Sequence, residues 1–193
     1  NLLGKAEKEA QFGMLSTDFT MIRAGSLHKA NGGYIVIPVL IAQALRKALL
    51  AKAGGKILLP IDTVISDKMT DDAVTKVVEG NIPDDMEGFD IGPDTVRRYS
   101  EVIASAKTIL WNGPMGMFED PRFAAGTQAV AKAAVEATQK HGAKSIIGGG
   151  DSAAAIEQLG FADQVTHVST GGGASLSMLE GEKFKAVEIL DEA

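Results

Sequence analysis

The stretch SIIGGGDSAAA (residues 145–155) contains the strongest indication of the fold. It has the pattern of a short apolar strand, three successive glycines and a helix that begins at Asp151. The same order recurs in HVSTGGGASLSMLEG (residues 167–181), where we expect Ser175 to begin the helix. In this arrangement the free backbone N–H groups of the helix N-terminus point toward an anion. A third glycine loop, WNGPMGMFE (residues 111–119), precedes both. Together the three loops predict that the chain binds a phosphorylated ligand.

Outward from these loops, strand-like and helix-period segments alternate from about residue 40. We expect helices over residues 40–50, 96–106, 123–139, 151–159 and 174–180, and strands over 34–37, 56–59 with 63–65, 108–111, 145–147 and 167–169. A polar loop is expected after residue 65, and Asp94 is the expected N-cap of the second helix. Such alternation predicts βαβ units, with ligands at the carboxyl ends of the strands. The predicted fold is a single α/β domain over residues 1–193, a three-layer, Rossmann-like parallel sheet with helices on both faces.

Composition narrows the function classes. The chain has 193 residues, a net charge of −6 and no cysteine. An acidic chain without a basic run is a poor match for nucleic acid, because binding DNA or RNA requires cations that displace counterions. No apolar stretch reaches the roughly 18 residues of a membrane span, and no signal peptide pattern is present. We therefore expect a cytoplasmic protein that binds a small molecule, without a nucleic-acid or membrane partner.

Five ordered motifs resemble the C-terminal, nucleotide-binding half of phosphoglycerate kinase. They are KILLPID (56–62), MEGFDIGPDT (86–95), WNGPMGMFE, IIGGGDSAAAIEQLG (146–160) and STGGGASLSMLEG (169–181). The resemblance covers about residues 45–190, and the nucleotide-binding part is assigned to residues 45–193. It implies a glycolytic kinase that transfers a phosphoryl group between 1,3-bisphosphoglycerate and Mg-ADP, a phosphotransferase with a carboxyl group as acceptor. The implied cofactors are Mg²⁺ and ADP or ATP.

Two departures from the family pattern lead to a second expectation. The family's GGAKVSDK-like and GGGMAYTF-like loops are absent from the sequence. Residues 1–39, through FGMLSTDFTMIRAGSLHKANGGYIVI (12–37), instead resemble Lon-related ATP-dependent proteases, with Pro38 where a Walker B acid would stand. This indicates a chimera with a foreign N-terminal segment. The substrate half of the kinase is also missing from the resemblance, so we expect an isolated chain to be incompetent. It would pair with that missing domain, or swap a strand with another copy.

The resemblance assigns nucleoside contacts to the first glycine loop. It implies that Glu119 binds the ribose hydroxyls, and a carboxylate is a good bidentate acceptor for a diol. The alternative is a solvated acid before a helix. The remaining nucleoside contacts are assigned to Phe89, Asn112, Gly113, Pro114, Gly116 and Met117. Taken alone, Phe89 and Met117 would more often be plain core residues.

The other two glycine turns receive the phosphates and the metal. Gly148 and Gly171 are assigned to phosphate binding, and Gly149, Gly150 and Gly172 to catalysis through their backbone. Asp151 is the implied Mg²⁺ ligand, since Mg²⁺ typically takes one or two carboxylates together with phosphate oxygens. Its alternative role is an N-cap. Ser152 is a candidate phosphate or N-cap hydroxyl, and tight turns without a ligand are the alternative for the glycines.

Two other readings remain open at this level. In the first, the chain is a non-catalytic fold recombined from fragments, and its glycine turns bind nothing. In the second, it is a fragment of a protease ATPase, which the absence of a Walker A sequence disfavours. For the N-terminal segment we predict that residues 34–37 form a buried parallel strand. This strand would share a sheet with residues 57–58 and 146–147, and the helix at 40–50 would be the right-handed crossover.

Overall fold

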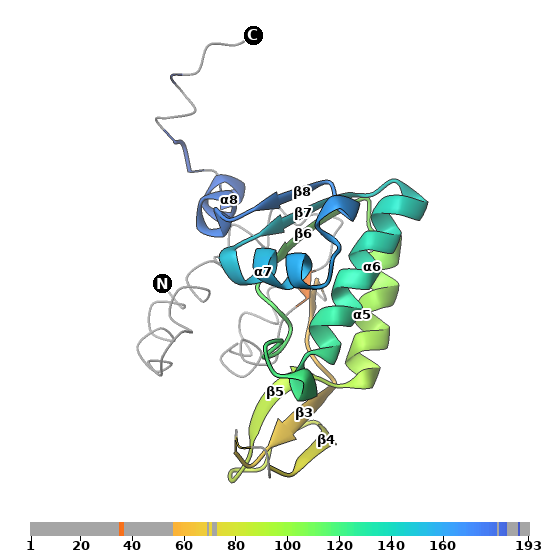
Figure 1. Ribbon diagram of the computed structural model, residues 1–193, viewed down its shortest axis with the longest axis vertical. Helices are drawn as coiled ribbons and strands as arrows, with labels where there is room; N and C mark the ends of the chain where they lie inside the picture. The colour runs from red at the N-terminus through yellow and green to blue at the C-terminus, as the bar shows by residue number, and fades with distance from the viewer. Residues whose placement is uncertain are drawn as a thin grey trace.

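The computed structural model describes residues 35–36, 56–68, 70, 73–180, 182–184 and 189. Within these residues the strands form three sheets, and the helices pack beside the sheet that lies nearest the C-terminus (Figure 1). That sheet has the order β6-β7-β8 and is wholly parallel, with β6 at Thr108–Asn112, β7 at Lys144–Gly148 and β8 at His167–Ser169. The predicted α/β class, a Rossmann-like parallel sheet flanked by helices, is confirmed.

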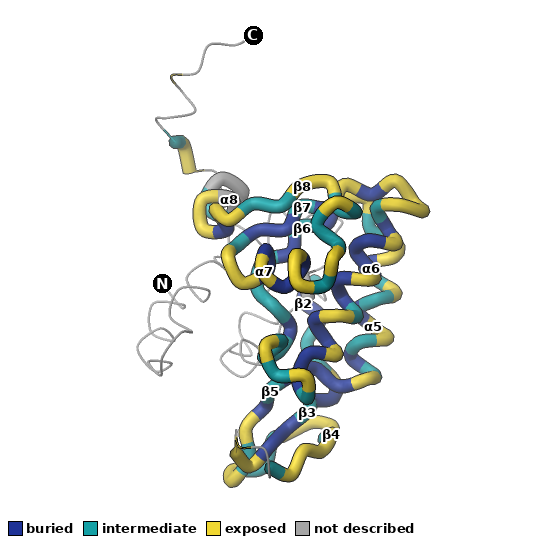
Figure 2. Tube along the Cα trace, in the orientation of Figure 1, coloured by how far each residue is buried: buried dark blue, intermediate teal, exposed yellow. Residues whose placement is uncertain are grey.

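Helix α6 (Ala125–His141) connects β6 to β7, and α7 (Gly150–Gln158) connects β7 to β8. Alanine and valine at helical spacing form most of the buried face of α6, and Figure 2 shows the buried residues as dark-blue segments along the helix. The helix ends at Gly142, whose φ of 67° is the left-handed conformation that glycine adopts without a Cβ clash. The expected start at residue 123 was too early, because Pro121–Phe123 forms a separate 3₁₀ turn, η2.

The segment after Pro60 corrects the sequence-based expectation. Residues 56–59 and 63–65 are not one interrupted strand: β2 (Ile57–Leu58) and β3 (Asp62–Ser66) belong to different sheets. The expected polar loop instead contains β4 (Thr75–Glu79), and β5 (Glu87–Ile91) follows it. These strands form an antiparallel sheet of order β4-β3-β5 at the bottom of the view in Figure 1.

Helix α5 (Pro93–Ser105) begins earlier than expected, and its N-terminus is capped from another element. The N-cap is Gly92, not Asp94, and it makes no side-chain cap bond. The carboxylate of Asp62 on β3 accepts the N–H groups of Asp94 at 3.0 Å and of Thr95 at 2.7 Å. A negative charge at a helix N-terminus is favourable, so β3 holds the start of α5 in place. Helices α5 and α6 lie side by side (Figure 1).

The prediction for the N-terminal strand is confirmed in one respect and wrong in another. Strand β1 (Ile35–Val36) pairs in parallel with β2, with Ile35 opposite Ile57 and Val36 opposite Leu58. However, β1 and β2 form a two-stranded sheet of their own, which is not hydrogen-bonded to β7 within the part of the chain that is described. The predicted crossover helix at residues 40–50 lies outside the described residues.

The core lies between the parallel sheet and helices α5 and α6. Its largest fully buried side chains include Tyr99, Phe123, Ile91 and Ile147. The Tyr99 hydroxyl donates to the Leu58 carbonyl at 2.8 Å, which ties α5 to β2. Across the described residues, no helix has the length and apolar character that a membrane crossing would need.

Candidate functional site

The three parallel strands bring their carboxyl ends together at one edge. Asn112 at the end of β6 lies opposite Gly148 at the end of β7, and Gly148 lies opposite Ser169 at the end of β8. Each strand then runs into one of the three glycine loops. The sequence therefore correctly predicted that these loops share one edge of the sheet, where α/β proteins bind ligands.

At this edge the backbone approaches so closely that side chains are excluded. A Cβ added to Gly149 would lie 2.5 Å from Asn112 Oδ1, and one added to Gly172 would lie 2.6 Å from Gly149 Cα. Gly149 also has φ 98° and ψ 148°, a conformation almost restricted to glycine. Asn112, Gly149 and Gly172 thus form a contact cluster that joins all three loops.

The N–H groups of the second glycine turn divide into two sets. Gly149 N–H donates to the Ser169 carbonyl at 2.9 Å, so it is already engaged and does not offer itself to a phosphate. The first bond of the α7 ladder runs from Ala153 N–H to the Gly149 carbonyl at 2.9 Å. The N–H groups of residues 150–152 precede that bond, as in the first turn of any helix. In the third glycine turn, Gly171 N–H donates to Ser169 Oγ at 3.2 Å. Helix α8 (Gly172–Glu180) follows, and it begins three residues before Ser175, where the helix was expected to start.

Asp151 lies in the first turn of α7, with an exposed side chain. The alternative role of N-cap is wrong for this residue, because the N-cap position is Gly149 and no side chain caps the helix. The carboxylate therefore projects beside the turn without a capping bond. Among the described residues, no group of three or more His, Cys, Asp or Glu side chains could hold a metal ion by itself.

Ser152 has a different partner from the one expected. Its side chain is fully buried, and its Oγ accepts the Gly113 N–H at 2.6 Å. Gly113 has φ 92° and begins the loop after β6. Ser152 thus links the first turn of α7 to the first glycine loop. Its proposed contact with phosphate stays a prediction.

The first glycine loop is held by side chains and carbonyls along its length. Trp111 Nε1 donates to the Gly113 carbonyl at 2.7 Å. Farther on, the N–H groups of Met115 and Gly116 donate to Thr127 Oγ1 at 3.0 and 3.3 Å. Sequence reasoning missed Thr127, although a buried hydroxyl on the first turn of an alanine-rich helix is the kind of residue that satisfies a neighbouring loop.

The predicted nucleoside residues Phe89, Pro114, Met117 and Glu119 are arranged around this loop. Met117 N–H donates to the Phe89 carbonyl at 2.9 Å, which attaches the loop to β5. The Phe89 ring stacks on Phe123 with centroids 4.7 Å apart, so part of this ring serves packing. Glu119 is exposed, as both its ribose-binding role and its solvated alternative require. Pro114 and Met117 are half-buried.

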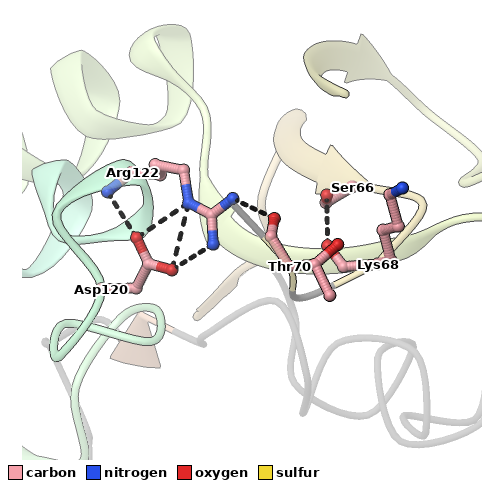
Figure 3. Close-up of polar contacts among 5 residues, drawn as sticks. All are labelled: Ser66, Lys68, Thr70, Asp120 and Arg122. Carbon is pink, nitrogen blue, oxygen red and sulfur yellow. Dashed lines mark hydrogen bonds and ion pairs between the residues drawn. The ribbon is translucent and has the colours of Figure 1, made fainter. Parts of the chain in front are cut away.

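An ion pair fixes the chain just beyond the loop (Figure 3). Arg122 Nε donates to both carboxylate oxygens of Asp120, at 3.0 and 3.1 Å, and another guanidinium nitrogen donates to the Thr70 carbonyl at 2.8 Å. The side-chain hydrogen bond from Arg122 lowers the pKa of Asp120. The same guanidinium lies 5.2 Å from the Phe123 ring centroid. Arg122 therefore connects η2 to the segment between β3 and β4.

One further carboxylate lies beneath the loop. Asp90 on β5 is fully buried, and burial raises its pKa to about 6 although two backbone N–H groups, of Gly126 and Ile91, act in the opposite direction. Its oxygens accept Gly126 N–H at 2.7 Å and Ile91 N–H at 2.8 Å. Asp90 was not among the predicted site residues.

Comparisons with known proteins match almost the whole chain to one family. The family profile described as "Phosphoglycerate kinase" matches residues 2–182. The chain is 50% identical over 199 residues to "Phosphoglycerate kinase" of Rhodopirellula baltica, covering 100% of this chain and 47% of that protein. It is 54% identical over 153 residues to "Phosphoglycerate kinase 3, cytosolic" of Arabidopsis thaliana, covering 77% of this chain and 38% of that protein. The chain thus spans about half the length, or less, of these relatives.

A solved structure shows the same fold. The phosphoglycerate kinase of Coxiella burnetii superposes with a TM-score of 0.67 at 37% identity, over 86% of this chain and 44% of that one. Residues 1–39 need a correction: the family match begins at residue 2 and the first relative above covers the chain from end to end. The comparisons therefore give no support to a Lon-related segment or to a chimera.

Proposed function

Because the chain belongs to the phosphoglycerate kinase family, we propose that the carboxyl edge of β6, β7 and β8 binds Mg-ADP or Mg-ATP. The observation that supports this most is the contact cluster of Asn112, Gly149 and Gly172, which joins the three glycine loops at one point. The reaction served is phosphoryl transfer between 1,3-bisphosphoglycerate and Mg-ADP, in the cytoplasm. The name of the Arabidopsis relative, which is called cytosolic, supports that location.

The phosphates are assigned to the first turn of α7. The N–H groups of residues 150–152 precede the intrahelical ladder, and the helix dipole favours an anion at that end. Gly149 and Gly172 contribute close approach of the backbone, since any Cβ at either position would collide with the cluster, and Gly148 and Gly171 are proposed to line the phosphate site beside them. Phosphoryl transfer needs little covalent chemistry from a protein, so positioning of this kind is the main contribution of these residues.

Asp151 is the residue proposed to hold Mg²⁺. Its carboxylate is exposed, makes no capping bond and lies in the turn assigned to phosphate. One carboxylate fits a magnesium ion that arrives with the nucleotide, because Mg²⁺ keeps waters and phosphate oxygens as its other ligands. When bound, the ion would offset charge on the phosphates. This chain's part is to present one oxygen donor there.

The nucleoside is assigned to the first glycine loop. Glu119 is proposed to accept the ribose hydroxyls, and Asn112, Gly113, Pro114 and Met117 to form the wall beside the base. Phe89 supports that wall through the Met117 N–H bond and its stack on Phe123. Ser152 is proposed mainly to hold Gly113 in place, through a hydroxyl that is already engaged at 2.6 Å.

The complete reaction also requires a site for the phosphoglycerate. Since the chain spans 47% of the Rhodopirellula relative, we propose that a substrate domain completes the site and that the 193-residue chain turns over poorly alone. We expect it to bind Mg-ADP with a Kd on the order of hundreds of micromolar or weaker. The reason is that the chain lacks the GGAKVSDK-like and GGGMAYTF-like loops, and losing the contacts of each loop weakens binding about tenfold or more.

The proposal is tested by titrating the chain with ADP, with and without Mg²⁺, in a calorimeter. Asp151→Asn should weaken binding about tenfold with Mg²⁺ and little without it, as expected for the loss of one charged contact. The matched control is Asp94→Asn, since Asp94 is likewise an acid in the first turn of a helix but lies on α5, where it pairs with Arg97 at 2.8 Å. Absence of heat at millimolar Mg-ADP would reject the nucleotide site. Equal losses with and without Mg²⁺ would reject only the metal role.

A further inference from the structure

Asp90 lies at the junction of three elements next to the proposed nucleotide loop. Its side chain is fully buried on β5, and its two oxygens accept the N–H groups of Ile91, on its own strand, and Gly126, in the first turn of α6. A carboxylate without solvent contact is costly to keep unless fixed donors hold it. The two hydrogen bonds therefore hold both the carboxylate and the start of α6 in place.

The same carboxylate is in contact with the loop itself. A Cβ on Gly116 would collide with Asp90 Oδ1, and a Cβ on Gly126 would collide with it from the side of α6. The two glycines therefore allow the loop and the helix to close on the carboxylate. Because neither backbone can move closer, the carboxylate sets their separation from β5.

The loop also makes hydrogen bonds to residues that adjoin Asp90 or its partner Gly126 in the sequence. Phe89, the preceding residue, accepts Met117 N–H at 2.9 Å. Thr127, which follows Gly126, accepts the N–H groups of Met115 and Gly116. A displacement of Asp90 would thus reach residues 115–117 by direct contact, through β5 and through α6.

We propose that Asp90 is a positioning residue for the nucleotide site. It holds the loop of residues 113–119 at the separation from β5 that nucleotide binding requires. This inference rests on the proposed function. Asp90 does not touch the nucleotide in this account. It acts on Met117 and Glu119 through the loop that carries them.

A second buried carboxylate offers a matched control. Asp62 on β3 is also buried and also accepts two backbone N–H groups, in its case both at a helix start, and it would also collide with a Cβ on a glycine, Gly92. Its partners belong to α5, however, and none belongs to the glycine loops. Asp62→Asn should therefore reproduce the stability loss of Asp90→Asn without its effect on the site.

Three measurements on the 193-residue chain separate the two roles: thermal unfolding, quenching of Trp111 fluorescence by acrylamide, and calorimetric titration with Mg-ADP. Trp111 is the single tryptophan and donates into the loop at Gly113, so it reports on the loop without a ligand. Both variants should melt earlier. Only Asp90→Asn should increase quenching and weaken Mg-ADP binding, by about fivefold to tenfold, as for one misplaced contact set. Equal quenching and equal affinity in the two variants would overturn the proposal.

A second pair of variants covers the case in which Asp90→Asn does not fold. Gly116→Ala keeps the carboxylate but pushes the loop away from it, and Gly92→Ala makes the corresponding collision with Asp62. Gly116→Ala alone should increase Trp111 quenching and weaken Mg-ADP binding. If the unmodified chain binds no Mg-ADP, the proposed nucleotide site fails, and unchanged quenching in Asp90→Asn and Gly116→Ala would separately overturn the role of Asp90.

Discussion

Replacing Gly149 by alanine tests whether the glycine turn is required by geometry. At φ 98° and ψ 148° an alanine is strained by about 1–3 kcal/mol. Its Cβ would also lie 2.5 Å from Asn112 Oδ1, so Asn112 or the turn must shift. The combined loss in free energy of unfolding should reach at least about 2 kcal/mol, a large share of the 5–15 kcal/mol typical of a domain.

The adjacent Gly150 is the control. It is the first residue of α7, and a Cβ there meets nothing within 4 Å. Alanine at this position should be neutral or stabilise the chain by up to about 1 kcal/mol, because glycine is the poorer helix former. Urea unfolding followed by Trp111 fluorescence gives both values. The reasoning is refuted if Gly149→Ala unfolds within about 0.5 kcal/mol of the unmodified chain, which is the range of an ordinary surface change.

Two further predictions concern buried polar groups. Ser152→Ala should lower the free energy of unfolding by about 1–3 kcal/mol, because it leaves the Gly113 N–H without its 2.6 Å acceptor. A smaller loss of unfolding free energy, measured in urea, would contradict the link. Asp90 has a pKa of about 6 in the fold against 3.8 as the ordinary value, so the folded chain binds more protons than the unfolded chain between these pH values. Its contribution to stability is therefore present below pH 4 and is lost as the pH rises to about 6, by up to about 3 kcal/mol. The free energies of unfolding of the unmodified chain and of Asp90→Asn should be measured in urea from pH 4 to 7. The advantage of the unmodified chain should shrink with rising pH, and a constant difference between the two chains would exclude the raised pKa of Asp90.

The parallel sheet and its glycine edge could be predicted because their signals are local. The runs ILW, SII and HVS are short and apolar, and each is followed by a glycine loop. The antiparallel strands gave no such signal. Strand β4 (TKVVE) is mostly exposed and does not alternate in burial, and β5 (EGFDI) contains a glycine and two acids.

The roles of single polar residues could not be read from the sequence because their partners are distant. Asp62 caps a helix that begins 31 residues later, and Ser152 Oγ accepts a hydrogen bond from the N–H of a residue 39 positions away. A single sequence favours the local role for such residues, an N-cap or an exposed acid. Asp94 was expected to be an N-cap, and Asp151 had that role as its alternative, but in both cases a glycine occupies the N-cap position.

The N-terminal segment shows the limit of a short likeness. The Lon-like reading depended on 26 residues, at positions 12–37, whereas the family profile spans residues 2–182. The apolar, β-branched character of residues 34–37 predicted a buried parallel strand, and the pairing of β1 with β2 confirms a parallel strand there.

The central claim is that nucleotide binds where β6, β7 and β8 end. The most direct measurement is a map of backbone amide chemical shifts during titration of the labelled chain with Mg-ADP. We predict that the largest changes fall on residues 112–119, 149–152 and 170–173, with little change in the sheet β4-β3-β5. Changes centred on that antiparallel sheet, or no changes at millimolar Mg-ADP, would contradict it.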